Sequence, residues 1–307
     1  NIKTIDDEAF NGLRSLKEFI VDENNLSFTS LDGILYSKDG TTLIKMPIAY
    51  KERDILIKEG TQKIQNYAFN DCLNTKSVAL PEGLISIGDY AFTDSTNLTS
   101  INFPSTLKSI GDYAFRNIHS LKEINLNEGL ETLGDGSFYQ TSLEKVSFPS
   151  TLKEIPLYSF YFCRNLKTVS FKEGLVTIGE QAFISTSIIN LSLPNSLKTI
   201  SQSAFELCSF LENVEFNEGL ETIASFAFSR ANNINSISLP STLKNIGYNP
   251  FSGISRLGYT DNFKVASNNP YFEIIDNVLF TKGENKKLLS YPFGKEDVEY
   301  HIPSGTT

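Results

Sequence analysis

The chain has 307 residues, 40% of them hydrophobic, and carries a formal net charge of −9 at pH 7. This acidic balance argues against a nucleic-acid partner, because affinity for a phosphate backbone rests mainly on Lys and Arg. No segment approaches the ~20 consecutive apolar residues that a membrane-spanning helix needs, so we predict no membrane span within this sequence. Phe, with 23 copies against no Trp and one Met, is the preferred large apolar side chain.

The first distinctive stretch covers residues 21–47. Within it, Asp32-Gly-Ile-Leu-Tyr36 is followed by the turn residues Lys38-Asp-Gly40 and by a run that ends at Pro47. An alternating strand, a Gly-containing turn and a return strand closed by Pro are typical of a β-hairpin. We therefore interpret residues 21–47 as a β-hairpin insertion.

Residues 57–251 contain nine consecutive copies of one repeat. A Phe recurs every 22 or 23 residues, at positions 69, 92, 115, 138, 160, 183, 205, 228 and 251, and Phe10 marks an earlier copy. This interval lies in the length range of leucine-rich repeats, in which each coil buries its apolar edge against its neighbours. The period predicts a solenoid.

Within one copy, the spacing of apolar residues predicts two extended runs. Ile101 and Phe103 flank the polar Asn102 with the two-residue period of a half-buried strand, and Pro104 ends that strand because it has no N–H to donate. Similar triplets recur in the other copies, so we expect a parallel sheet along one face with its strands stacked in register.

The second half of each copy predicts a shorter inward run and a turn. Leu107 and Ile110 point inward again, and Gly111 allows a sharp turn. Ala114-Phe115 then fills the interior. We expect a short helical turn around each repeated Phe, as in Asp112-Tyr-Ala-Phe115.

Residues 265–292 repeat the insertion near the other end of the chain. Tyr36 and Phe280 are 244 positions apart, as are Asp32 and Asp276. After this second β-hairpin insertion the repeat resumes at Ile302-Pro-Ser-Gly-Thr306. Because the chain opens with Asn1 just before a repeat Phe and stops as a coil begins, we expect residues 1–307 to be one continuous solenoid fragment of a longer protein.

The three cysteines share one position of the coil, three residues after a repeat Phe, at Cys72, Cys163 and Cys208. Stacked strands lie ~4.8 Å apart, so even the closest pair, two coils apart, exceeds the ~7 Å Cα separation that a disulfide allows. The same distance argues against a shared metal ion. We interpret the cysteines as small buried hydrophobic residues.

The repeat L-x-x-I-x-F-P-x-x-L-x-x-I-G-x-x-A-F resembles that of the BspA-like leucine-rich repeat family. The matching residues in one copy are Leu98, Ile101, Phe103, Pro104, Leu107, Ile110, Gly111, Ala114 and Phe115. The resemblance covers essentially the whole chain. It implies an α/β-type repeat solenoid, a leucine-rich-repeat right-handed coil with a parallel β-sheet face, second short extended runs, short helical turns and the two β-hairpin insertions.

The resemblance also implies a location and a role. Proteins of this family are typically secreted or displayed on the surface of bacteria and some parasitic protists, and are associated with attachment to host matrix proteins, host cells or other microbes. An extracellular or cell-surface location is therefore expected. The family has no shared catalytic residues to transfer.

Recognisable catalytic motifs are missing from the sequence. His119 and His301 are the only histidines, and neither lies in a motif for nucleophilic or metal chemistry. Acidic runs such as Asp6-Asp7-Glu8 could ligate calcium, but a solvated turn is the preferred interpretation, because calcium needs six or more oxygens around one point. We predict no enzyme activity, no cofactor and no metal.

Outward-facing positions of the predicted strands supply the first candidate binding surface. They are small, hydrogen-bonding residues with few charges and no aromatics, and either a protein-docking wall or the ordinary wet face of a sheet explains them. The candidate contacts are Ser100, Asn102, Glu123, Asn125, Lys145, Ser147, Thr168, Ser170, Asn190, Ser192, Asn213 and Glu215.

Aromatic residues supply a second candidate. Tyr36, Phe272 and Phe280 belong to the insertions, which are the only surface that is not part of the regular repeat, and insertions in repeat proteins often gather on a binding face. Tyrosines beside the repeat Phe, such as Tyr90 and Tyr113, are more readily explained by packing between coils.

Charges alternate from coil to coil. Lys108, Lys153, Lys198 and Lys244 alternate with Glu131, Val176 and Glu221 at one position of the repeat. An electrostatic recognition strip is one interpretation. We prefer avoidance of like-charge stacking, because alternation cancels the long-range field that recognition would use.

The sequence therefore predicts a non-enzymatic adhesion or protein-binding module with a host, matrix or other microbial protein as its partner. A structural spacer that displays another domain of a longer surface protein is the alternative from a different class. Glycan binding is a third hypothesis, although the strand face lacks the aromatic platforms typical of sugar sites.

Overall fold

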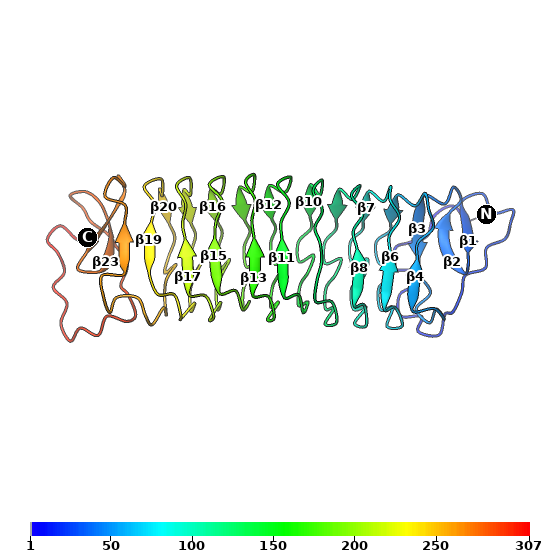
Figure 1. Cartoon of the computed structure of the whole chain (residues 1–307), viewed down its shortest axis with the longest axis horizontal. Coiled ribbons are helices and arrows are strands. Elements are labelled where there is room, and N and C mark those ends of the chain that lie inside the picture. Colours follow the sequence, from blue (N-terminus) through cyan, green and yellow to red (C-terminus); the bar gives the residue numbers. More distant parts are fainter. Residues whose placement is uncertain (1) are drawn as a thin grey trace. The chain divides into compact units, whose positions relative to one another are not determined.

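The computed structural model describes residues 2–307, which form strands, turns and loops and contain no helix (Figure 1). These residues fall into two compact units. Unit 1 comprises residues 2–152 together with Ser159–Arg164, and unit 2 comprises Lys153–Tyr158 together with Asn165–Thr307.

Unit 1 contains the two sheets of the N-terminal half. One has the order β1-β2-β3-β5-β7-β9-β10, and the other has the order β4-β6-β8. The strands of unit 1 are β1 (Phe28–Leu31), β2 (Ile34–Ser37), β3 (Thr42–Lys45), β4 (Asp54–Leu56), β5 (Lys63–Ile64), β6 (Ser77–Ala79), β7 (Ser86–Ile87), β8 (Ser100–Asn102), β9 (Ser109–Ile110), β10 (Thr132–Leu133) and β11 (Lys145–Ser147).

Unit 2 repeats this plan. Its larger sheet has the order β12-β14-β16-β18-β20, and the pairs β15-β17 and β19-β21 and the sheet β22-β23-β24 complete it. Its strands are β12 (Glu154–Ile155), β13 (Thr168–Ser170), β14 (Thr177–Ile178), β15 (Asn190–Ser192), β16 (Thr199–Ile200), β17 (Asn213–Glu215), β18 (Thr222–Ile223), β19 (Ile237–Leu239), β20 (Asn245–Ile246), β21 (Phe263–Val265), β22 (Phe272–Ile275), β23 (Val278–Thr281) and β24 (Leu288–Ser290).

Most coils contribute one short strand to each of two stacks of parallel strands (Figure 1). The coil that contains Ile124 contributes only β10 and an isolated bridge between Glu123 and Lys145. The parallel register places equivalent residues side by side, as in Val78 opposite Ile101 and Ile87 opposite Ile110. Ile101 is buried while Asn102 is exposed, as the two-residue period predicts. Stacked coils with parallel strands are thus confirmed. The strand of the Leu98–Phe115 copy begins one residue earlier than expected, at Ser100.

The repeated Phe rings form the core of each unit. In unit 1, Phe115 is fully buried and stacks on Phe92 at 5.0 Å and on Phe138 at 5.2 Å between ring centroids, with interplanar angles of 6° and 7°. In unit 2, Phe205 stacks on Phe183 and Phe228, both at 5.3 Å. Offset stacking and burial both contribute to stability, so every coil depends on its neighbours.

The prediction of helical turns around the repeated Phe is wrong, and the α/β description that depends on it is wrong as well. The backbone N–H groups of Tyr90, Phe92 and Asp94 donate to carbonyl oxygens of the next coil at 2.8, 2.7 and 3.0 Å, instead of to the preceding turn of a helix. Tyr90 and Asp94 also have φ values of 54° and 60°, which a right-handed helix excludes. The chain forms successive tight turns whose bonds join coils.

Both insertions are built from antiparallel strands. In residues 21–47, β2 and β3 pair across the turn at Lys38–Gly40, and β1 pairs with β2 across Asp32-Gly33. Asp32 and Gly33 have φ values of 51° and 79°, the positive values that a two-residue hairpin turn requires. The second insertion has the same arrangement in β22, β23 and β24.

Candidate functional site

The outward strand positions of unit 1 all lie in solvent. Ser100, Asn102, Glu123, Asn125, Lys145 and Ser147 are exposed and define what we call the polar face of unit 1. Lys145 Nζ lies 3.3 Å from Glu123 Oε1, and Asn125 Nδ2 donates to Asn127 Oδ1 at 3.1 Å. The face is therefore accessible, and its charges are partly paired within it.

The outward strand positions of unit 2 form an equivalent polar face, made by Thr168, Ser170, Asn190, Ser192, Asn213 and Glu215, all exposed. Asn213 Nδ2 donates to Asn190 Oδ1 at 2.7 Å, and Ser192 Oγ donates to Glu215 Oε2 at 3.3 Å. These hydrogen bonds orient the side chains along a row and leave further donors and acceptors facing solvent.

The three aromatic residues predicted as contacts in the insertions are not available to a partner, which corrects the second candidate surface. Tyr36, Phe272 and Phe280 are buried, with 2%, 4% and 0% of their surface exposed. The reason is that each insertion packs its apolar side chains inward as part of the core, as buried Leu35 and Leu279 also show. Burial also raises the pKa of the Tyr36 hydroxyl.

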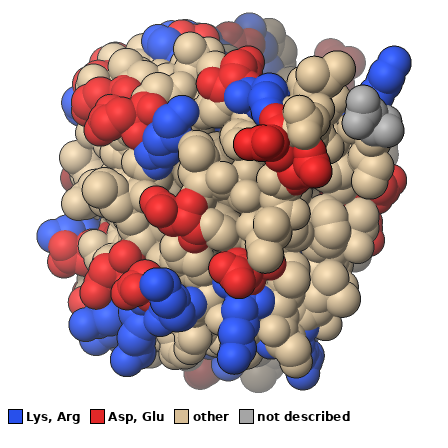
Figure 2. All heavy atoms as spheres, turned by 90° about the vertical axis from the view of Figure 1, so that its right-hand side faces the viewer, with Lys and Arg blue, Asp and Glu red and all other residues tan. Residues whose placement is uncertain are grey.

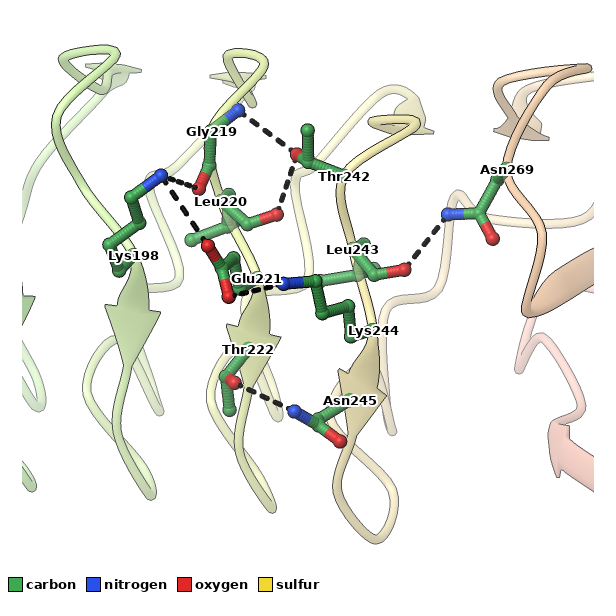
Figure 3. A network of polar contacts seen from close by, with 10 residues as sticks. All are labelled: Lys198, Gly219, Leu220, Glu221, Thr222, Thr242, Leu243, Lys244, Asn245 and Asn269. Carbon is green, nitrogen blue, oxygen red and sulfur yellow. Dashed lines mark hydrogen bonds and ion pairs between the residues drawn. The ribbon is translucent and has the colours of Figure 1, made fainter.

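The alternating charges pair between neighbouring coils. Glu221 forms ion pairs with a lysine of the coil on each side of it (Figure 3). Lys244 Nζ lies 2.8 Å from Glu221 Oε2, and Lys198 Nζ lies 3.5 Å from Glu221 Oε1. Lys108 lies 3.0 Å from Glu131 in unit 1. The hydrogen bond from Lys244 holds the pKa of Glu221 below its usual range. Pairing along the stack supports the interpretation that alternation avoids like-charge neighbours.

A further set of glutamates binds the backbone of the next coil, which the sequence analysis did not predict. Glu218 accepts from the Ser241 N–H at 3.0 Å and from its hydroxyl at 2.7 Å, and the Asn195 N–H donates to Glu173 at 2.9 Å. These hydrogen bonds lower the pKa of both carboxyl groups. The sequence signal was the alternation of Glu with Ser or Asn at this position.

Threonines next to these glutamates also join coils. The Thr242 hydroxyl accepts from the Gly219 N–H at 2.9 Å and donates to the Leu220 carbonyl at 2.8 Å (Figure 3). Many polar side chains on this side of the coils are thus used for stability. The polar faces remain the better candidates for recognition.

Tyrosines beside the repeated Phe stack on one another in unit 1. Tyr90 lies 5.0 Å from Tyr67 and 5.3 Å from Tyr113, with interplanar angles of 3° and 18°. Because Tyr90 stacks on a ring at each side, both of its faces are occupied. This confirms packing between coils and argues against a flat aromatic platform for sugars.

Groups with catalytic potential do not converge in the described residues. His119 and His301 are both exposed, and within residues 2–307 no cluster of three or more His, Cys, Asp or Glu side chains could hold a metal ion. Cys72, Cys163 and Cys208 are buried, as predicted, and burial raises the pKa of their thiols to about 12, 11 and 11. Thiols in that state are poor nucleophiles.

The side chain at the cysteine position, three residues after a repeat Phe, donates a hydrogen bond to the backbone of the preceding coil. Cys163 Sγ donates to the Phe138 carbonyl at 3.1 Å, and the Ser95 hydroxyl donates to the Phe69 carbonyl at 2.6 Å. Both donors follow a repeat Phe by three residues. The shared position is visible in the sequence, but the hydrogen bond is not.

Coils of 22 or 23 residues with two stacks of parallel strands and a stacked Phe core define a β-solenoid of the leucine-rich-repeat type. The chain belongs to the BspA-type leucine-rich repeat family. A profile of the BspA type leucine rich repeat region, containing six copies, matches residues 49–163 and 131–258. None of the curated proteins matches the sequence.

Solved structures with this fold come from several bacteria. A leucine rich cell surface protein from Faecalibacterium prausnitzii is 21% identical with a TM-score of 0.52, over 93% of this chain and 66% of its own. A leucine-rich repeat protein from Eubacterium ventriosum is 21% identical with a TM-score of 0.50, over 83% of this chain and 57% of its own. The pneumococcal vaccine antigen PcpA is 26% identical with a TM-score of 0.45, over 59% of this chain and 44% of its own. The chain thus spans about half to two thirds of the length of these proteins.

No helix among residues 2–307 combines the length and apolar character that crossing a bilayer requires.

Proposed function

We propose that the chain is a non-enzymatic, cell-surface or secreted module that binds a host, matrix or other microbial protein through its polar faces. The observation that carries the proposal is the exposure of every outward strand residue, from Ser100 to Glu215, in two rows of hydrogen-bonding side chains. Flat faces of solenoids suit extended protein surfaces.

Membership in the family and the composition of the faces support this proposal. The polar faces carry few charges and no aromatic residues, which favours contacts through many hydrogen bonds. One protein with the same fold, from Faecalibacterium prausnitzii, is a cell surface protein. We extend that location to this chain as part of the proposal.

The test uses two variants that make the same change in the two sheets of unit 2. Asn190→Arg places a bulky charge on the polar face, and Asn245→Arg places it on the other sheet, where Asn245 is equally exposed. Binding to a panel of immobilised extracellular-matrix proteins is measured by biolayer interferometry. We expect Asn190→Arg to weaken binding about tenfold or more and Asn245→Arg to leave it unchanged.

Other results would contradict the proposal. Equal effects of the two variants would show that the polar face does not make the contact. No binding by the unchanged chain, in a range of matrix and bacterial surface proteins, would favour a structural spacer instead.

A further inference from the structure

We infer that the open edge of β4 and the groove beside it, in unit 1, bind an extended, positively charged peptide segment by strand addition. The site is the edge of the sheet that also carries Ser100 and Asn102, but its ligand would pair with backbone groups at that edge and not with the polar face. Three observations carry it: an unpaired strand edge, a groove along that edge, and the charges that line the groove.

The backbone of β4 is paired on one side only. Within the sheet β4-β6-β8, the Ile57 N–H donates to Ala79 at 3.0 Å, and the Arg53 carbonyl accepts from Ser77 at 3.2 Å. Successive residues of a strand point their N–H and C=O groups to opposite sides, so those of Asp54 and Leu56 face away from β6. Each offers a free donor and acceptor to a further strand.

β4 is short and begins with the charged Asp54, but other features that protect a sheet edge are missing from it. Its sequence is Asp54-Ile-Leu56, without Pro, Lys or a bulge, and Leu56 leaves 78% of its surface exposed. Unprotected edges of this kind are templates for a pairing chain. Leu56 adds apolar surface that an arriving side chain could cover.

A groove runs along this edge. A cavity of about 740 Å³ is lined by β4, by the hairpin residues Asp32–Ile34 and by Tyr50, and a second cavity of about 340 Å³ shares Asp32, Ile34 and Leu56 with it. Ile34, Tyr50 and Ile55 are buried and supply apolar walls. The space therefore lies beside the unpaired N–H groups, where an added strand would run.

The charges of the groove select a cationic occupant. The linings of the two cavities contain five carboxylates against three ammonium groups, namely Glu18, Asp32, Glu52, Asp54 and Glu59 against Lys17, Lys51 and Lys58. Lys51 already lies 3.8 Å from Glu52, so the remaining balance is negative. Figure 2 shows both acidic and basic side chains among uncharged residues at the end of the molecule where the N-terminus lies.

These features together define the chemistry of the ligand. An extended segment that alternates apolar side chains with Lys or Arg would place its apolar residues against the groove walls and its cations beside the acidic rim. The chain's net charge of −9 would also attract such a segment from a distance.

The experiment measures fluorescence anisotropy of a labelled peptide of about ten residues that alternates Lys with Val, added to the unchanged chain at low salt. A matched peptide that alternates Glu with Val is the control. We expect saturable binding of the Lys-Val peptide only. Equal binding of both peptides, or of neither, would overturn the proposal.

Variants locate the site. Leu56→Pro removes the free N–H without touching the bonds to β6 and should weaken binding about fivefold to tenfold. Glu18→Gln with Asp32→Asn keeps the edge and should weaken binding mainly at low salt. Leu56→Ala is the matched control, because it shortens the side chain but keeps the backbone N–H, and it should have the smaller effect on binding.

Two results would refute the assignment even if the Lys-Val peptide binds. One is unchanged binding by Leu56→Pro and by the charge variant, both shown to be folded by circular dichroism. The other is a concentration-dependent dimer that Leu56→Pro abolishes and that excludes the peptide, which would make a second copy of this chain the occupant of the edge.

Discussion

Phe115→Ala is the perturbation that best examines the packing of the coils. The ring is fully buried, stacks on Phe92 and Phe138, and meets Phe103 edge-on at 5.5 Å. Removal of a buried Phe costs about 3–5 kcal/mol through lost burial and the cavity left behind. The loss of two stacked neighbours places this site toward the upper end of that range.

The assay is urea unfolding followed by circular dichroism, with Phe115→Leu and Asn102→Ala as companions. Phe115→Leu keeps most of the apolar volume but loses the stacking, so it should cost about 1–2 kcal/mol. Asn102 is exposed, so Asn102→Ala should lower the free energy of unfolding by less than about 0.5 kcal/mol. Equal shifts of the midpoint for Phe115→Ala and Asn102→Ala would refute the assignment of inward and outward faces.

Three further predictions test other contacts between coils. Gly111→Ala should destabilise the chain by about 1–3 kcal/mol in thermal unfolding, because a Cβ there would lie 2.7 Å from the Asp89 backbone nitrogen, and an unchanged midpoint would contradict this close approach. Glu221→Gln should lower the melting temperature at pH 7 relative to the unchanged chain. The pKa of Glu221 is lowered in the folded state, so its charged form stabilises the fold at pH values above the unfolded pKa of about 4.5. The difference in melting temperature between the two proteins should therefore shrink as the pH falls through the folded pKa. A difference in melting temperature that grows in acid would contradict this prediction. The three buried thiols should resist a thiol reagent at pH 8 in the native chain and all react after denaturation, whereas rapid native labelling would show that Cys72 or its counterparts are accessible.

The parts of the fold that sequence could predict are those with a period. The recurrence of Phe at 22 or 23 residues led to the stacked core, and the alternation in Ile101-Asn-Phe103 identified which side chains point inward. Both depend on spacing alone. For the same reason the pairing of Lys244 and Lys198 with Glu221 followed once equivalent positions were placed side by side.

Helical turns were wrongly predicted because a short window of residues such as Asp112-Tyr-Ala-Phe115 carries no sign of where its N–H groups will bond. In the structure Tyr113 donates to Asp135 and Phe115 to Ser137, each in the next coil. A parallel neighbour at hydrogen-bonding distance competes with the helix, and the tertiary contact decides the outcome.

The insertion aromatics were misjudged for a related reason. Departure from the repeat was taken to indicate exposed surface, but Tyr36 and Phe280 lie in strands that pack their apolar side chains into the core. Alternation within Ile34–Ser37 does not separate an inward from an outward face, because three of its four residues are buried. These strands complete the core only in the folded chain.

The most direct test of the proposed binding face is site-specific photo-crosslinking. A photoreactive residue replaces Ser192 on the polar face of unit 2, or Asn245 on its other sheet, and each protein is irradiated with the matrix proteins that the unchanged chain binds. We predict crosslinks from position 192 and none from position 245. Crosslinks from position 245 alone would contradict the account, because they would place the partner on the sheet whose side chains join the coils.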